Sequence, residues 1–195
     1  MTRAVTIATA LLLAMVVAMG SYLYHLRCNE QARAQNVPDT RPISAPVTGP
    51  AARVTFYLAY DDPGVVRAQE TSIALPADPA QRGREILHAL VGEYVKRPSS
   101  HELAAGADVR DVFLVNDNTA VVDTTPAFAE GHRSGIFVET LTVASLVKTL
   151  TANLPGVTRV KILVDGKERQ TLAGHADLED FYEVAAMEQM LQQLQ

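Results

Sequence analysis

Hydrophobic and polar residues follow a period of two at the start of the region after residue 52. Arg53–Tyr60 alternates in this way and predicts a strand, because successive side chains of a strand point to opposite faces. The turn residues Asp61–Gly64 follow, and Val66–Leu75 predicts a second, more polar strand that pairs back on the first. The folded region therefore begins with an antiparallel ribbon.

Two later stretches carry apolar residues at helical spacing. Asp78 caps the first predicted helix, which ends before Pro98. Its apolar stripe consists of Ile86, Leu87, Leu90, Val91 and Tyr94. The second predicted helix begins near Ser134–Ile136 and ends at Pro155-Gly156, because proline cannot donate its amide and glycine closes helices. Its stripe consists of Val143, Leu146, Val147, Leu150 and Leu154.

The remaining strands complete a pattern of strand pair, helix, strand pair, helix, strand pair. Val109–Val115 and Thr119–Thr124 are joined by turn residues, and Arg159–Val164 leads into Asp165-Gly166, a dipeptide that favours a two-residue hairpin turn. Paired strands between single helices predict an α+β fold with a single mixed, mostly antiparallel sheet and helices packed on one face.

A short amphipathic helix is predicted at the C-terminus, over residues 179–195. Its apolar side consists of Val184, Met187, Met190, Leu191 and Leu194. A helix of this kind packs on its own domain, fills a partner groove or forms a short coiled coil, and methionines suit irregular surfaces. We expect the first of these.

The N-terminal segment, residues 1–28, predicts a transmembrane helix. Ala4–Tyr24 is uncharged and almost wholly apolar, and its length matches a hydrocarbon core of about 30 Å. Arg3 precedes it and favours a single-pass inner-membrane orientation with the domain on the extracytoplasmic side. The alternative is a signal peptide cleaved before Ser21. With either a membrane anchor or a signal peptide, the domain is expected to be exported.

Residues 29–52 predict a linker, because Pro38, Pro42, Pro46 and Pro50 favour an extended path and the composition cannot form a core. Cys28 is the only cysteine, so an intrachain disulfide and a cysteine metal site are both excluded. Lipidation of Cys28 is disfavoured by Arg27, since the preceding residue should be small. The predicted domain then spans residues 53–178.

Charge and motifs exclude several classes of function. The net charge of -5 argues against nucleic acid as a partner, because phosphate binding needs clustered Lys and Arg. Neither a G-x-S-x-G nucleophile motif nor a phosphate-binding loop is present. The carboxylate pairs Asp61-Asp62 and Glu179-Asp180 flank turns or helix starts, where solvated acids are common.

The one loose set of possible metal ligands consists of His132, Glu139, His175 and Asp177. Their spacing completes no known metal motif, but convergence on a common point in the fold would make a metal site. We therefore predict no catalytic, cofactor-binding or metal-ligating residues, and a protein that is not an enzyme.

Several segments in order resemble the sporulation and spore germination GerMN domain. They are Val54–Leu58, the helix at Leu87–Leu90, Ala120–Asp123, the run from Leu141 to Gly166, and Thr171–His175. The resemblance covers nearly all of residues 53–178. It implies an exported, non-enzymatic α/β module that stands behind a lipoprotein signal or membrane anchor.

Together these observations predict a membrane-tethered extracytoplasmic module of the bacterial cell envelope that acts by protein–protein interaction or assembly. Its partners would be the membrane, through the N-terminal helix, and an envelope protein or a second copy of the chain. The strand Val66–Leu75 is the expected binding edge because it is the most polar. The alternative is an envelope enzyme or a domain that binds peptidoglycan or a small ligand.

Overall fold

The computed structural model describes residues 15, 19–20, 49–116 and 118–193. The chain divides into two units, residues 1–45 and residues 46–195, and the fold below belongs to the second. No helix within the described ranges has the length and apolar character needed to cross a bilayer. The predicted transmembrane helix, Cys28 and most of the linker fall on residues outside those ranges.

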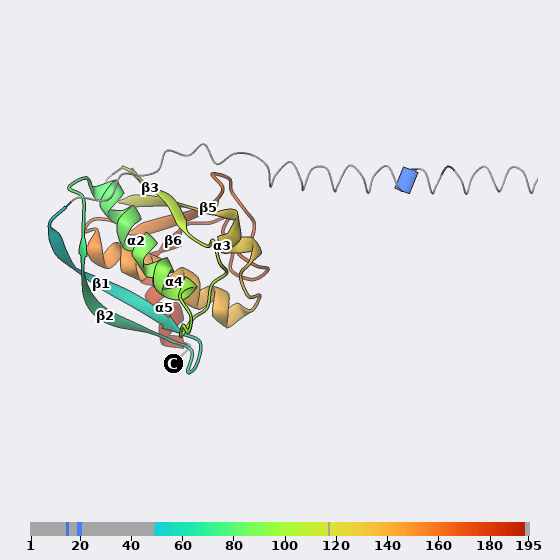
Figure 1. Ribbon diagram of the computed structural model, residues 1–195, viewed down its shortest axis with the longest axis horizontal. Coiled ribbons are helices and arrows are strands. Elements are labelled where there is room, and N and C mark those ends of the chain that lie inside the picture. Colours follow the sequence, from blue (N-terminus) through green and yellow to red (C-terminus); the bar gives the residue numbers. More distant parts are fainter. Residues whose placement is uncertain (1–14, 16–18, 21–48, 117, 194–195) are drawn as a thin grey trace, which may run out of the picture. The chain divides into compact units, whose positions relative to one another are not determined.

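The domain begins with the predicted ribbon. Strand β1 (Ala51–Tyr60) pairs antiparallel with β2 (Val65–Ala74), from Ala51 opposite Ala74 to Tyr60 opposite Val65 (Figure 1). One face of β1 carries Val54 and Phe56 into the core, whereas no side chain of β2 is buried. The prediction of a core strand paired with a polar strand is confirmed.

Both long helices form where the apolar periodicity predicts them. Helix α2 spans Pro79–Val95, and Asp78 caps it by accepting the N–H of Gln81 at 2.9 Å. A short helix, α3 (Pro126–Glu130), precedes α4 (Ile136–Asn153). The largest fully buried side chains are Tyr94, Phe128, Leu75, Ile86, Leu87, Leu90, Leu141, Leu146, Leu150, Ile162, Leu172 and Leu178.

Four strands form a second sheet in the order β3-β4-β5-β6. Its members are β3 (Val109–Val115), β4 (Thr119–Thr124), β5 (Arg159–Val164) and β6 (Tyr182–Glu183). The β4–β5 pair is parallel and the other two pairs are antiparallel.

The hairpin predicted after β5 is wrong beyond its turn. Asp165 and Gly166 adopt φ of 55° and 70°, as a tight turn requires, but among the described residues β5 makes only one bridge across this turn, between Val164 and Lys167. Glu168, Arg169 and Gln170 follow Lys167 and are polar, so this stretch lacks the apolar residues of a core strand, and the next apolar residue is Leu172. The short strand β6 therefore takes the place beside β5.

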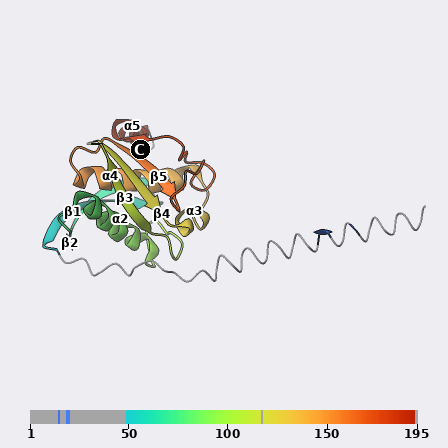
Figure 2. The same cartoon turned by 90° about the horizontal axis from the view of Figure 1, so that it is seen from above.

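The α+β class is confirmed, but the single sheet with helices on one face is wrong. Helix α2 lies against β3, α4 lies against β1, and the two helices contact each other. Figure 2 shows the ribbon set apart from the four-stranded sheet. Helix α4 is consequently buried on most of its sides, with ten buried residues. Its sequence is apolar enough for this position, because a helix that is hydrophobic all round belongs in a core.

The last helix, α5 (Val184–Gln193), packs against α4 and buries Met187 and Leu191. The expectation that the C-terminal helix packs on its own domain is confirmed for the described residues. Met190 is exposed instead of sharing the buried side.

Candidate functional site

The free edge of β1 is closed by polar side chains of α4. Ser145, Thr149 and Asn153 lie four residues apart and so share one face of the helix. The N–H of Tyr57 donates to Thr149 Oγ1 at 2.8 Å, and Ser145 Oγ donates to the carbonyl of Tyr57 at 2.6 Å. The amide of Asn153 accepts the N–H of Thr55 at 3.0 Å and donates to the carbonyl of Thr55 at 2.8 Å. The helix therefore satisfies the strand edge as a neighbouring strand would.

The same edge is closed further along, at Ala59. The N–H of Ala59 donates to the hydroxyl of Tyr94 at 2.8 Å, and Ser100 Oγ donates to the carbonyl of Ala59 at 2.8 Å. The polar backbone groups of Thr55, Tyr57 and Ala59 thus all have side-chain partners. No further strand can pair with β1 there without displacing them.

The opposite edge of the ribbon, along β2, has no hydrogen-bonded strand beside it among the residues that the structure describes. The backbone N–H and C=O groups of Thr55, Tyr57 and Ala59 point away from β2. The β1 residues between and beside them therefore exchange backbone hydrogen bonds with the β2 residues opposite, which are Arg67, Gln69 and Thr71. The other β2 residues then direct their N–H and C=O groups away from β1. We call these four residues the β2 edge: Val66, Ala68, Glu70 and Ser72. Within the described part of the chain, β1 is the only strand that pairs with β2.

The edges of the four-stranded sheet are less accessible to an added strand than the β2 edge. Strand β3 has a register shift between Val109 and Asp111, and Arg84 Nε donates to the carbonyl of Arg110 at 2.8 Å. Irregular registers and covering side chains are common ways of protecting a sheet edge. Strand β6, at the other end, has only two residues. The β2 edge is therefore the longest open edge among the described strands.

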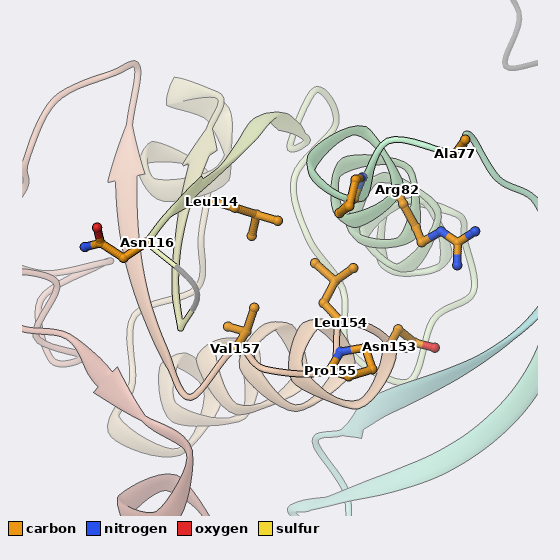
Figure 3. Close-up of a pocket in the computed structure, with 9 residues that line it drawn as sticks. Ala77, Arg82, Leu114, Asn116, Asn153, Leu154, Pro155 and Val157 are labelled. Atoms are coloured by element: carbon orange, nitrogen blue, oxygen red, sulfur yellow. The ribbon is translucent and has the colours of Figure 1, made fainter.

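A groove lies between the start of α2, the end of β3 and the end of α4 (Figure 3). Its volume is about 710 Å³. Its lining consists of Ala77, Pro79, Arg82, Leu114, Asn116, Asn153, Leu154, Pro155 and Val157. Leu114, Leu154 and Val157 face a common space, and the guanidinium of Arg82 extends away from it. The lining combines apolar and polar groups, and the Asn153 amide is already bonded to β1.

Glu139 is a fully buried carboxylate that joins two loops. It accepts the N–H groups of Gly135, Ala173, His175 and Ala176 at 2.9 to 3.1 Å, and it also pairs with His175 Nδ1 at 2.9 Å. Burial acts to raise the pKa of Glu139, but these donors outweigh it and lower the pKa to about 2. The carboxylate is an ionised structural anchor for the start of α4.

Two buried histidines meet one hydroxyl. His101 Nε2 and His132 Nε2 both lie 2.7 Å from Thr142 Oγ1, and His101 Nδ1 lies 2.6 Å from Asp61 Oδ1. Arg133 also forms an ion pair with Asp61. Burial lowers the pKa of His101, against the effect of Asp61, and burial also lowers the pKa of His132. His101 and Thr142 are at most 1% exposed, so a substrate cannot reach them.

The four possible metal ligands from the sequence do not converge. Glu139 and His175 are in contact, but His132 binds Thr142, and Asp177 Oδ1 accepts the N–H of Glu179. No three His, Cys, Asp or Glu side chains form a group that could hold a metal ion in the described ranges. Asp61 is not merely a turn acid, since it binds His101 and Arg133.

Residues important to this arrangement were missed by sequence reasoning. His101 has no local motif, because its partners Asp61 and Thr142 are 40 and 41 residues away in the chain. The row Ser145, Thr149 and Asn153 did carry a signal. Polar residues four apart on an otherwise apolar helix indicate that this face meets polar groups rather than a hydrophobic sheet face.

The family model for sporulation and spore germination, Germane, matches residues 54–170. The chain belongs to this family. The match extends from β1 past the turn after β5, and the predicted resemblance to GerMN domains is confirmed. None of the curated proteins matches the Germane chain in sequence.

The Germane domain is similar to two solved structures from Bacillus subtilis. The tandem GerMN domains of the sporulation protein GerM give a TM-score of 0.52 at 21% identity, over 69% of this chain and 46% of the tandem-domain chain. The first GerMN domain of GerM gives a TM-score of 0.45 at 18% identity, over 66% of this chain and 94% of that domain. The chain thus spans less than half of the tandem protein, and at this identity the tandem structure supports the fold alone.

Proposed function

We propose that this chain is a membrane-tethered, extracytoplasmic GerMN-type domain that acts as a protein–protein interaction or assembly module in the bacterial cell envelope. The observation that carries the proposal is the contrast between the two edges of the ribbon. Side chains close the β1 edge, whereas the β2 edge leaves backbone donors and acceptors open to a partner.

An extended segment of an envelope protein fits this edge. The ten residues of β2 span about 33 Å at roughly 3.3 Å per residue, enough for a full added strand. Main-chain hydrogen bonds supply affinity in such strand addition, and side-chain contacts supply specificity. The side-chain partners of β1 hold the ribbon in place before binding, which reduces the ordering cost.

The proposed location of the domain, outside the inner membrane, rests on the N-terminal segment. Its apolar run has the length of a single inner-membrane span, and the proline-rich linker would hold the domain on the periplasmic or extracytoplasmic side. Membership of the sporulation and spore germination family is consistent with a role in the cell envelope.

A non-enzymatic role agrees with the buried polar groups. The two histidines and Thr142 contact protein groups and are buried, and Glu139 anchors backbone.

The groove supports the alternative of a small-ligand site. Its lining places the apolar side chains Leu114, Leu154 and Val157 beside the polar Arg82 and Asn116, so it does not by itself select an apolar group over a sugar.

The proposal is tested by copurification of the full chain, in mild detergent, from bacteria that carry its native partners. Ala68→Pro removes an N–H that points away from β1, so the ribbon is kept and partner binding is expected to be lost. Ala68→Val keeps the N–H and serves as the matched control. Equal recovery of the same partner with Ala68→Pro and Ala68→Val would contradict strand addition.

A further inference from the structure

We infer that Asp61, His101, Thr142 and His132 form a buried site that binds one proton, shared between the two histidine rings. This inference is independent of the proposed function. Four contacts in series carry it. They are Asp61 Oδ1–His101 Nδ1 at 2.6 Å, His101 Nε2–Thr142 Oγ1 at 2.7 Å, Thr142 Oγ1–His132 Nε2 at 2.7 Å and His132 Nδ1–Arg133 O at 2.7 Å.

The ends of the series fix one proton on each ring. The carbonyl of Arg133 only accepts, so His132 Nδ1 must carry a proton to bond to it. The carboxylate of Asp61 likewise accepts from His101 Nδ1. If both rings are neutral, both Nε2 atoms are acceptors, and both face one hydroxyl that has a single proton. One of the two 2.7 Å contacts then lacks a proton.

One added proton completes the series. One ring donates through Nε2 to Thr142 Oγ1, and the hydroxyl donates to the other ring. The carbonyl of Val138, which lies 3.0 Å from Thr142 Oγ1, is then released from the hydroxyl. A second proton would place two cationic rings with centroids 6.2 Å apart in a buried site. Like charges at that separation oppose each other strongly where water is excluded.

The groups that face the series also favour a single proton. Asp61, from the turn between β1 and β2, is the anion in contact with a ring, and Arg133 from the loop before α4 already pairs with it. Tyr94 from α2 lies edge-on to His101 at 4.9 Å, and burial raises the pKa of Tyr94 to about 12, so it brings no charge. Glu139, on α4 itself, is an anion that acts on His132 from a distance.

Burial lowers the pKa of each ring, so the proton enters on acidification below the ordinary histidine value of 6.5. Its uptake connects four segments: the β1–β2 turn, the loop after α2, α4 and the α3–α4 loop. A change in the pH of the surroundings therefore changes the hydrogen bonds that Thr142 makes between these segments.

Nitrogen NMR of the histidine rings tests the inference, using the full chain in detergent micelles labelled with ¹⁵N-histidine. Spectra from about pH 8 to about pH 4.5 cover the range in which such a ring titrates. His101→Gln and His132→Gln assign the two signals. We expect both rings to change in one transition whose amplitudes sum to one proton. Two full, separate protonations overturn the inference, and so does the absence of any titration before unfolding.

Thr142→Val provides the second arm, because valine keeps the shape but removes the shared hydroxyl. In Thr142→Val we expect the midpoint of histidine protonation to fall by about 1 pH unit, because this shift corresponds to the free energy of about one hydrogen bond. Thr142→Ser keeps the hydroxyl and should retain the wild-type midpoint. An unchanged midpoint in Thr142→Val contradicts the inference. If Thr142→Val does not fold, the proton count of the wild-type chain decides alone.

Discussion

The hydroxyl of Thr149 accepts the backbone N–H of Tyr57 at 2.8 Å, across 92 residues of sequence. This contact belongs to a row in which a helix satisfies the edge of a strand instead of covering the face of a sheet. It explains why the ribbon stands apart from the four-stranded sheet, and why only its other edge is open.

Thr149→Val should leave the N–H of Tyr57 buried without an acceptor. A buried donor without a partner costs about 1–3 kcal/mol of unfolding free energy. Urea unfolding should therefore show a lower midpoint with an unchanged m value. Thr149→Ser keeps the hydroxyl and should lose much less. Equal stability of Thr149→Val and the wild type would show that the contact does not hold the ribbon.

Glu139→Gln should be more costly, because the charged acceptor serves several N–H donors at once. Each hydrogen bond to a charged group contributes about 1.5–3 kcal/mol, so a loss of about 3 kcal/mol in unfolding free energy is expected at neutral pH. Glu130→Gln, at the exposed end of α3, is the matched control and should change stability by less than about 0.5 kcal/mol.

Glu139 also predicts an acid limit to stability. Its folded pKa of about 2 lies below the ordinary 4.5, so its contribution is present above pH 4.5 and is lost as the pH falls from 4.5 towards 2. Chemical unfolding in steps across this range should show a steeper loss for the wild type than for Glu139→Gln. Parallel curves would mean that the carboxylate is not held by the loops.

His101 predicts a separate change at higher pH. Burial lowers its pKa below 6.5, so its contribution to stability is complete above pH 6.5 and decreases as the pH falls. His101→Gln should flatten the stability curve below pH 6.5.

His88 provides a control of opposite sign. Its hydrogen bond with Asp108 raises the pKa of His88, so its contribution is complete below 6.5 and is lost as the pH rises through the folded pKa. His88→Gln should therefore steepen, not flatten, the loss of stability on acidification. The same response in both variants would contradict the assignment of these pKa directions.

The sequence predicted where the helices and strands of this domain lie along the chain better than it predicted which of them lie side by side. Alternation and helical spacing located β1, β2, α2, β3, β4, α4 and β5 to within a few residues. The turn at Asp165-Gly166 was also predicted, but local turn chemistry does not determine which strand lies beside β5. That place depends on β6, 18 residues after Val164.

The candidate site could be predicted only in part, because local sequence does not determine contacts between distant segments. The polarity of β2 indicated an outer strand, as found. The closure of β1 depends on α4 side chains nearly a hundred residues away, such as Asn153 bound to Thr55. The helical row of polar residues could have indicated this closure, whereas the meeting of His101 with His132 depends on tertiary packing alone.

Site-specific photo-crosslinking in intact native cells tests the central claim most directly. A photoreactive amino acid in place of Glu70, on the β2 edge of the full chain, should crosslink to a discrete envelope protein or to a second copy of the chain. The same probe in place of Glu168, an exposed residue in the loop after β5, is the control and should not. Introducing Ala68→Pro should abolish the Glu70 product. Equal products at Glu70 and Glu168, or a Glu70 product that survives Ala68→Pro, would contradict binding at the β2 edge.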